Sequence, residues 1–308
     1  MNKKLLFIFN PFSGKAQIKN NLFDITDTFT KAGYDVTLRP TQQRMDAYNY
    51  IRLHGSEYDR VVVSGGDGTL NEAVKGLMTF DSAERRSLGY IPAGTTNDFA
   101  STLNIPKNMY EAAFVAVNGD EFQCDVGRFN DKIFNYVAAF GAFTDVSYDT
   151  PQGTKNALGH MAYVFEGIKR LSNLSSYHVN IKYDGGEIDD DIFLCIVLNA
   201  TSVAGIHTSE KLLNVNLNDG LFEMLVFRQP TNLIRLQSVL TGLMKGEDSG
   251  DDYSIIKSSR FEFVSEEDIK WTLDGEYGGS PSHTVIEVLH SAMTFIVDKD
   301  KIEKLAEE

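Results

Sequence analysis

Three short polar segments in the first third of the chain combine glycines with hydroxyl and carboxylate side chains. They are residues 10–15 (NPFSGK), 64–72 (SGGDGTLNE) and 92–99 (PAGTTNDF). Paired glycines let backbone N–H groups approach an anion without a Cβ clash, and a helix starting near Asn71 would direct its positive end at phosphate. Hydroxyl donors are available from Ser13, Thr69 and Thr95. The three segments therefore predict a phosphate-binding site.

A carboxylate within the second segment adds a requirement. Asp67 would repel a phosphate unless a divalent cation lay between the two groups, so we expect Mg²⁺ beside a nucleoside triphosphate. Each segment also has a plainer interpretation: NPFSG and GGDGT as turns, and GTTND as a helix N-cap. Their order and spacing favour a phosphate site over three unrelated turns. No GxxxxGK[ST] motif is present, which excludes a Walker-type loop.

The elements that would position these segments alternate in type. Short β-rich runs occupy residues 5–9, 34–38, 60–63 and 88–91, and helical patterns occupy residues 18–29, 45–53, 97–103 and 109–117. This alternation predicts a Rossmann-like α/β domain with a parallel sheet over residues 1–125. Because parallel strands share the edge at which they end, the three polar segments should converge on one crevice.

The second half of the chain has a different pattern. β-rich runs separated by turn signals predict an all-β sandwich over residues 126–297; they lie at 132–140, 178–183, 192–198, 221–227, 259–264 and 285–289. Helices are expected at 157–171 and 231–245, and a charged helical tail at 298–308. Since no low-complexity linker separates the domains, we expect them to pack closely with a cleft between them.

Composition narrows the class of protein. The chain has 308 residues, of which 42% are hydrophobic and 23% charged, so it can bury a globular core. Its net charge of −14 is divided into −2 for residues 1–125 and −12 for the remainder, which disfavours nucleic-acid binding. Cys124 and Cys195 are interpreted as reduced core thiols of a cytoplasmic protein. No apolar run approaches the ~18 residues of a membrane span, so any membrane contact should be peripheral.

The motifs closely resemble those of the diacylglycerol kinase catalytic family, which includes sphingosine and ceramide kinases and soluble bacterial lipid kinases. NPFSGK, SGGDGTLNEA and PAGTTNDFA are similar to its three nucleotide loops. The likeness continues through CDVG, NYVAAFGAFTDV, NLNDGLFEMLV and LDGEYGG, and so spans essentially the whole chain. The later segments look most like the soluble bacterial diacylglycerol kinase. The resemblance implies an α/β nucleotide domain followed by a β-sandwich, in agreement with the pattern above.

The resemblance also implies roles for individual residues. ATP would be held by Asn10, Pro11, Phe12, Ser13, Gly14, Thr41, Gly66, Asp67, Gly68, Thr69, Leu70, Asn71, Glu72 and Thr95. The family's acidic positions around the catalytic Mg²⁺ are matched by Asp67, Asp98 and Asp125. A second, structural Mg²⁺ site would be formed by Asp219 with Asn216 and Leu221.

The LDGE segment is a candidate for the catalytic base. Glu276 falls at the position usually assigned in the family as proton acceptor from the lipid hydroxyl, and Asp274 is a close rival. Phosphoryl transfer needs such a carboxylate together with an anion cradle and a cation. On local sequence alone, Asp274-Gly275-Glu276 is more simply a hairpin turn, and Asn218-Asp219-Gly220 is also most simply a turn.

A further hypothesis concerns the membrane. The helix expected at 157–171 carries an apolar stripe and ends near Lys169 and Arg170. It would line an acyl-chain channel and bring this basic pair to anionic headgroups on the inner face of the membrane. A core stripe with a basic last turn explains the pattern equally well. Relatives often dimerise, which leaves a homodimer open although the sequence shows no heptad seam.

The leading hypothesis is a peripheral lipid kinase that transfers the γ-phosphate of Mg-ATP to 1,2-diacylglycerol and forms phosphatidic acid. One alternative is NAD kinase-like phosphorylation of a soluble substrate, since NAD kinases have a similar GGDGT loop but typically lack NPxSG and GTTNDFA. The other is a nucleotide-binding regulator without transferase activity. The acidic set argues against the regulator: Asp67, Asp98, Asp125, Asp274 and Glu276. No sequence pattern specifies which lipid is the acceptor.

Overall fold

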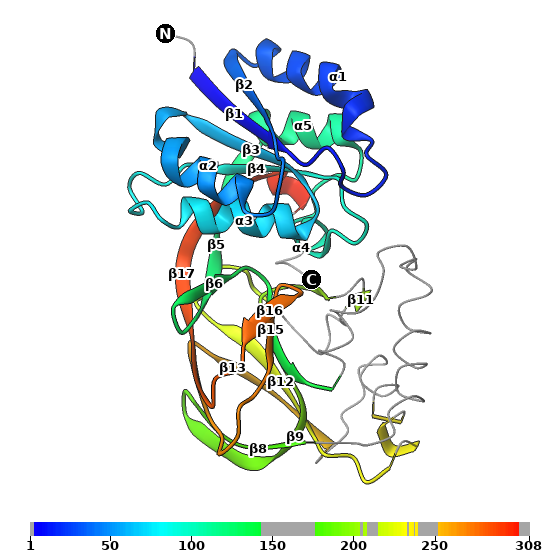
Figure 1. The fold of residues 1–308 in the computed structure, drawn as a ribbon, viewed down its shortest axis with the longest axis vertical. Helices are drawn as coiled ribbons and strands as arrows, with labels where there is room; N and C mark the ends of the chain where they lie inside the picture. The colour runs from blue at the N-terminus through cyan, green and yellow to red at the C-terminus, as the bar shows by residue number, and fades with distance from the viewer. Residues whose placement is uncertain are drawn as a thin grey trace. The chain divides into compact units, whose positions relative to one another are not determined.

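The described part of the chain forms two compact units (Figure 1). The computed structural model describes residues 3–142, 176–203, 206–207, 215–232, 234–236, 238–239 and 252–301. The first unit contains Met1–Asp125 and Ser291–Glu308, and the second contains Val126–His290. The first unit is therefore assembled from two segments that lie far apart in the sequence.

A parallel sheet forms the centre of the first unit. Its strands are β1 (Lys3–Phe9), β2 (Tyr34–Pro40), β3 (Arg60–Gly65), β4 (Leu88–Pro92) and the end of β17 (His283–Val297). They follow the order β2-β1-β3-β4-β17, and each neighbouring pair is parallel. Leu5–Ile8 of β1 and Val61–Val63 of β3 are completely buried, as expected for strands covered on both faces. The predicted α/β domain with a parallel sheet is confirmed.

Helices cover both faces of this sheet. In the described residues they are α1 (Ile18–Lys31), α2 (Asp46–His54), α3 (Asp67–Leu77), α4 (Asp98–Thr102) and α5 (Met109–Asn118), and a 3₁₀ turn (η1, Gly55–Glu57) follows α2. Because β2 lies on one side of β1 and β3 on the other, right-handed crossovers place α1 and α2 on opposite faces. Accordingly, α1 packs with α5, and α2 packs with α3.

The second unit is rich in antiparallel strands. These are β5 (Asp120–Phe129), which begins in the first unit, β6 (Lys132–Phe134), β7 (Val137–Gly141), β8 (Tyr177–Tyr183), β9 (Gly186–Leu198), β10 (Ser202–Val203), β11 (Ile206–His207), β12 (Phe222–Arg228), β13 (Tyr253–Ser258), β14 (Arg260–Val264), β15 (Trp271–Leu273), β16 (Glu276–Gly279) and the start of β17. Trp271 lies in the core, with its ring centroid 4.7 Å from that of Phe140 and 5.0 Å from that of Phe263. The predicted change from an α/β to a β-rich region is confirmed.

Two β-rich runs differ from the sequence expectation. Residues 132–140 form two strands, because the N–H groups of Asn135 and Tyr136 bond to the side chain of Asp274, which lies in a turn. The run expected at 285–289 is part of the 15-residue strand β17. Residues 291–297, which the sequence pattern places in the second domain, belong to the first unit, where Phe295 pairs with Leu88 of β4.

The helix expected at 157–171 lies outside the described residues. Within the range 231–245, residues 234–236 and 238–239 are helical, and most of the other residues lie outside the described part. In the tail, residues 299–301 are helical and the rest lies outside the described part. Among the helices that the structure describes, none combines the length and apolar character needed to cross a bilayer.

The boundary between the units crosses β5 and β17 at residues joined by a hydrogen bond. It falls after Asp125 in β5 and before Ser291 in β17, and Asp125 Oδ1 accepts the Ser291 N–H at 2.6 Å. Ser291 has a φ of 50°, a left-handed conformation that is unfavourable for a residue with a side chain. The buried carboxylate thus stabilises an irregular point in β17 within the first unit.

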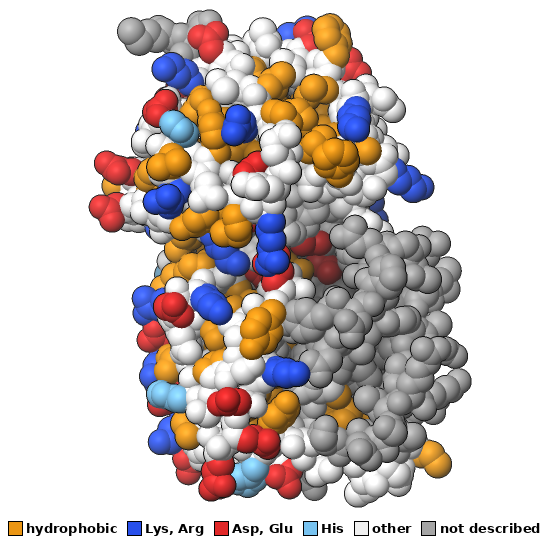
Figure 2. Space-filling model, viewed as in Figure 1, with side chains coloured by type: hydrophobic (Ala, Val, Ile, Leu, Met, Phe, Trp, Pro, Cys, Tyr) orange, Lys and Arg blue, Asp and Glu red, His pale blue; other side chains and the backbone are white. Residues whose placement is uncertain are grey.

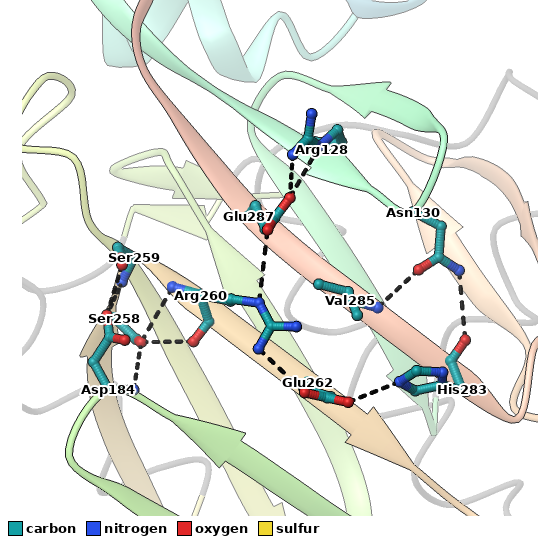
Figure 3. A network of polar contacts seen from close by, with 10 residues as sticks. All are labelled: Arg128, Asn130, Asp184, Ser258, Ser259, Arg260, Glu262, His283, Val285 and Glu287. Carbon is teal, nitrogen blue, oxygen red and sulfur yellow. Dashed lines mark hydrogen bonds and ion pairs between the residues drawn. The ribbon is translucent and has the colours of Figure 1, made fainter.

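Charged side chains of both signs are interspersed over the visible face of the second unit (Figure 2). A network of them connects β5, β14 and β17 (Figure 3). Arg128 Nε donates to Glu287 at 3.0 Å, Arg260 lies between Glu287 and Glu262, and Glu262 Oε1 is 2.9 Å from His283 Nε2. The network bridges three strands whose backbones are already paired or adjacent.

This network should contribute to stability in a pH-dependent way. A hydrogen bond with His283, followed by one with Arg260, lowers the pKa of Glu262 below its ordinary value of 4.5, and Arg128 lowers the pKa of Glu287. Since both folded pKa values are depressed, the stabilisation is present above the unfolded pKa and is lost as pH falls through the folded pKa.

We therefore expect a Glu262→Gln, Glu287→Gln variant to lose less stability than the wild type when the pH is lowered from about 7 to about 3. Urea unfolding at both pH values measures the difference. A Glu266→Gln, Glu267→Gln variant is the matched control, because it removes the same charge from exposed positions of the same unit. Equal pH dependence in all three proteins would contradict a contribution from the network.

Candidate active site

The first two polar segments meet where the strand order of the sheet reverses. The chain leaves β1 toward β2 on one side and leaves β3 toward β4 on the other. Such a switch point is the usual ligand site of an open α/β sheet. Here Ser13 Oγ accepts the Gly66 N–H at 3.0 Å, and Asn10 N donates to Ser64 O at 2.8 Å. These bonds hold the first and second segments together.

The third segment lies against the same point. Ala93 N donates to Gly65 O at 2.8 Å. A Cβ atom on Gly94 would lie only 2.6 Å from Gly66 Cα, and one on Gly14 would lie 2.3 Å from Ala93 O. Gly14 also has a φ of 53°. The glycines are thus required for the close approach of the loops, and the three predicted segments are brought together at one edge of the sheet.

Two residues outside the predicted ATP set support this arrangement. Asn97, with a φ of 53°, accepts the Gly94 N–H and donates to Gly94 O, both at 2.9 Å. The buried Tyr90 hydroxyl donates to Gly65 O at 3.1 Å. Asn97 could have been found as an Asn in a glycine-rich turn, where left-handed backbone is common. Tyr90 carries no such sequence signal, because its neighbours indicate only a buried strand.

Asp67 and Asp98 lie near one another at this edge. Asp67 is the first residue of α3, and its Oδ1 accepts the Phe99 N–H at 3.4 Å, directly beside Asp98. Burial, followed by the negative charges of Asp67 and Asp98, raises the pKa of the Tyr90 hydroxyl well above its ordinary value. Both carboxylates therefore lie close enough to the Tyr90 hydroxyl to raise its pKa. This places two of the three predicted acidic residues around one point.

The third predicted acidic residue, Asp125, is 1% exposed and bonds to Ser291 N. Among the residues that the structure describes, no three His, Cys, Asp or Glu side chains form a metal-binding group. Protein sites for Mg²⁺ commonly supply one or two carboxylates, with phosphate oxygens and water completing the octahedron. Asp67 and Asp98, beside glycines that have no Cβ atom, fit that kind of site.

Glu72, a member of the expected ATP set, bonds to the backbone of a neighbouring loop. Its carboxylate accepts the Met45 N–H at 2.8 Å and the Ala47 N–H at 3.2 Å, at the start of α2. The adjoining loop carries Thr41, which is buried and donates its N–H to Phe9 O at 2.9 Å. Glu72 thereby fixes the loop that contains Thr41.

The remaining residues of the expected ATP set differ in exposure. Asn71 is 2% exposed, and its Oδ1 has no hydrogen-bond partner among the described residues. The side chain of Leu70 is completely buried and Thr69 is nearly so, whereas Gly68 and Thr95 are exposed. In the first loop, Pro11 is half-buried and Phe12 is 76% exposed, with Lys19 Nζ 5.1 Å from its ring centroid.

The other predicted site residues belong to the second unit. Asp274 is buried and accepts three backbone N–H groups, while Glu276 is half-buried at the start of β16. Residues 217–220 form a turn in which Asp219 Oδ1 accepts the Leu221 N–H at 3.0 Å and Asn216 Oδ1 accepts the Asn218 N–H at 3.2 Å. These bonds bring the predicted structural Mg²⁺ residues into one short turn.

Comparisons with known proteins agree with the motifs. A family model described as the diacylglycerol kinase catalytic domain matches residues 4–129. A diacylglycerol kinase of Bacillus subtilis (strain 168) is 35% identical over 307 residues, which is 98% of this chain and 99% of that protein. One from Staphylococcus aureus (strain MRSA252) is 35% identical over 91% of this chain and 88% of that protein. The crystal structure of a diacylglycerol kinase from Bacillus anthracis str. Sterne has a TM-score of 0.77 and 28% identity, and covers 97% of this chain and 98% of that chain.

A pair of glycine variants tests whether phosphate binds at the start of α3. A Cβ on Gly68 would meet nothing within 4 Å, whereas one on Gly94 would overlap the Gly66 backbone. We expect Gly68→Ala to leave the free protein as stable or up to about 0.5 kcal/mol more stable, because alanine favours the helix. The same methyl should weaken Mg-ATP binding about tenfold if phosphate occupies that space.

Gly94→Ala should instead destabilise the free protein by about 1–3 kcal/mol, because the loops must separate. Thermal unfolding and calorimetric titration with Mg-ATP distinguish the two effects. Unchanged nucleotide affinity in Gly68→Ala would place the phosphates elsewhere.

Proposed function

This chain belongs to the diacylglycerol kinase family, and we propose that it transfers the γ-phosphoryl group of ATP to the free hydroxyl of 1,2-diacylglycerol, giving phosphatidic acid and ADP. The observation that carries the proposal is the convergence of three glycine-containing loops with Asp67 and Asp98 at the switch point of the sheet. The near full-length similarity to bacterial diacylglycerol kinases supports the lipid acceptor.

The first unit offers ATP a set of N–H donors. The backbone at Gly66–Thr69 begins α3, an 11-residue helix, and the N-terminal end of a helix attracts phosphate through its backbone N–H groups and its dipole. Ser13 and Thr95 add hydroxyl groups on either side of this helix start. Thr41, held on the loop that Glu72 fixes, is proposed to contact the nucleotide from the β2 side. The phosphates would therefore be bound chiefly by backbone donors and hydroxyl groups.

Bound Mg²⁺ would neutralise charge that develops on the transferred phosphoryl group. Asp67, Asp98 and Asp125 are proposed to hold it through direct or water-mediated contacts. The 216–221 turn is proposed as the separate structural Mg²⁺ site. The first site would supply carboxylate oxygens and the second both carboxylate and carbonyl oxygens, the donors that Mg²⁺ prefers.

Glu276 is proposed to accept the proton of the lipid hydroxyl. The lipid oxygen then forms a bond to the γ-phosphorus while the bond to the β–γ bridging oxygen breaks and ADP leaves. Asp274 is less suited to this task, because its oxygens already accept three backbone N–H groups. The peripheral membrane contact proposed for Lys169 and Arg170 concerns residues outside the described part of the chain.

Transfer of labelled γ-phosphate to diacylglycerol in mixed micelles tests the proposed reaction directly. We expect labelled phosphatidic acid that requires Mg²⁺ and is far more abundant than product from sphingosine, phosphatidylglycerol or NAD in parallel reactions. Label in NAD alone would favour the soluble-substrate alternative. ATP binding without transfer to any acceptor would favour a regulatory protein.

Two substitutions separate the proposed roles. Glu276→Gln should lower kcat by about 10²-fold or more while ATP binding stays near that of the wild type, because only the positioned base is removed. Asp67→Asn should chiefly impair use of Mg-ATP, and its apparent requirement for Mg²⁺ should rise. Steady-state kinetics over a range of Mg²⁺ concentrations measures both. A wild-type rate in Glu276→Gln would contradict its role as base.

A further inference from the structure

The carboxylate of Asp274 accepts hydrogen bonds from three consecutive backbone N–H groups. Its Oδ2 accepts the Asn135 N–H at 2.7 Å, and its Oδ1 accepts the N–H groups of Tyr136 and Val137 at 3.0 and 3.1 Å. The residue is only 5% exposed. These are charge-assisted bonds, which are shorter and stronger than neutral ones. Removing them would leave buried N–H donors without partners.

The backbone of Asp274 forms the turn that leads to Glu276. Leu273 of β15 pairs with Glu276 of β16, so the hairpin loop consists of Asp274 and Gly275 alone. Their φ angles are 50° and 81°. Positive φ at both central residues is the pattern of a type I′ turn, which matches the twist of paired strands. Glu276 thus follows Asp274 by two residues, and the same turn fixes its backbone position.

The segment that receives this carboxylate is itself fixed. Asp274 N donates to Val137 O at 2.9 Å, and Leu273 pairs with Ala138 in the β15–β7 ladder. On the other side, Asn199 N donates to Tyr136 O at 2.9 Å and ties the end of β9 to the same segment. The β15–β16 hairpin therefore bonds to a segment, residues 135–137, that is also hydrogen-bonded to Asn199 at the end of β9.

We propose that Asp274 is a positioning residue that fixes the orientation of Glu276 for proton transfer, and is not an alternative base. This inference rests on the proposed function of Glu276. The Asp274 carboxylate holds the β15–β16 turn against residues 135–137. The backbone that carries the Glu276 side chain therefore has one fixed position. A displacement of about 1 Å at a reacting group is enough to reduce a rate about 10²-fold.

A double-mutant cycle tests this proposal. In Asp274→Asn, one amide nitrogen must face an N–H donor, so the turn should shift. We expect kcat for diacylglycerol phosphorylation to fall about tenfold while KM for ATP stays within about twofold of wild type. Asp274→Asn combined with Glu276→Gln should be no more than about twofold slower than Glu276→Gln alone, because a residue acting through Glu276 has no effect once that carboxylate is lost.

Two further variants serve as controls. Asp184→Asn removes a turn carboxylate of the same unit that also accepts a backbone N–H, from Ser259 at 2.8 Å, and should keep the wild-type rate. Gly275→Ala strains the turn through its φ of 81° while its Cβ meets no atom within 4 Å. It should fold, lower kcat, and show the same non-additivity with Glu276→Gln, which keeps the proposal testable if Asp274→Asn is unstable.

The outcomes are distinct. Multiplicative losses in the cycle, or an Asp274→Asn variant slower than Glu276→Gln, would overturn the positioning role while leaving the kinase activity established. Absence of transfer by the wild-type protein would overturn the proposed function, and this inference with it. A non-additive cycle with both turn variants and an unaffected Asp184→Asn protein would support the proposal.

Discussion

The close contact between the backbones at Gly66 and Gly94 is the constraint on which the first unit depends. The two loops can approach to this distance only without side chains, and the strand order of the sheet is what brings them to the same edge. The Ser13 hydroxyl then bonds to the Gly66 N–H, and Asn97 bonds to both backbone groups of Gly94. Local hydrogen bonds thus hold in place the loops that the strand order brings together.

Several carboxylates in this protein bind the backbone of a distant segment. Glu72 holds the start of α2, Asp125 holds the irregular residue Ser291 in β17, and Asp274 holds the end of the link between β6 and β7. Each accepts backbone N–H groups from residues that lie more than 20 positions away in the sequence. A residue can therefore occur in a catalytic motif because it shapes the backbone there.

Much of the architecture could be predicted because it depends on local patterns. The β-branched run before Gly65 and the helical spacing of Ile18, Ile25 and Phe29 report burial directly. The full extent of β17 could not be predicted, since it depends on pairing between Phe295 and Leu88 of β4, which are far apart in the sequence. For the site, the glycine loops were evident from composition, whereas Tyr90 was not, because a hydroxyl group on a buried strand gives no periodic signal. The distinct positions of Glu72 and Asp274 were also hidden, because motif matching does not show which atoms accept a bond.

The two-segment composition of the first unit has a consequence for biosynthesis. Residues 291–297 leave the ribosome only after residues 126–290, so the nascent α/β sheet has an open edge at β4 until all of the second unit has emerged. Unpaired strand edges are templates for aggregation. Vectorial folding from the N-terminus, the usual order for multidomain chains, cannot complete the sheet here. The β-rich unit is therefore free to fold first, and its last strand then completes the sheet of the unit that was translated before it.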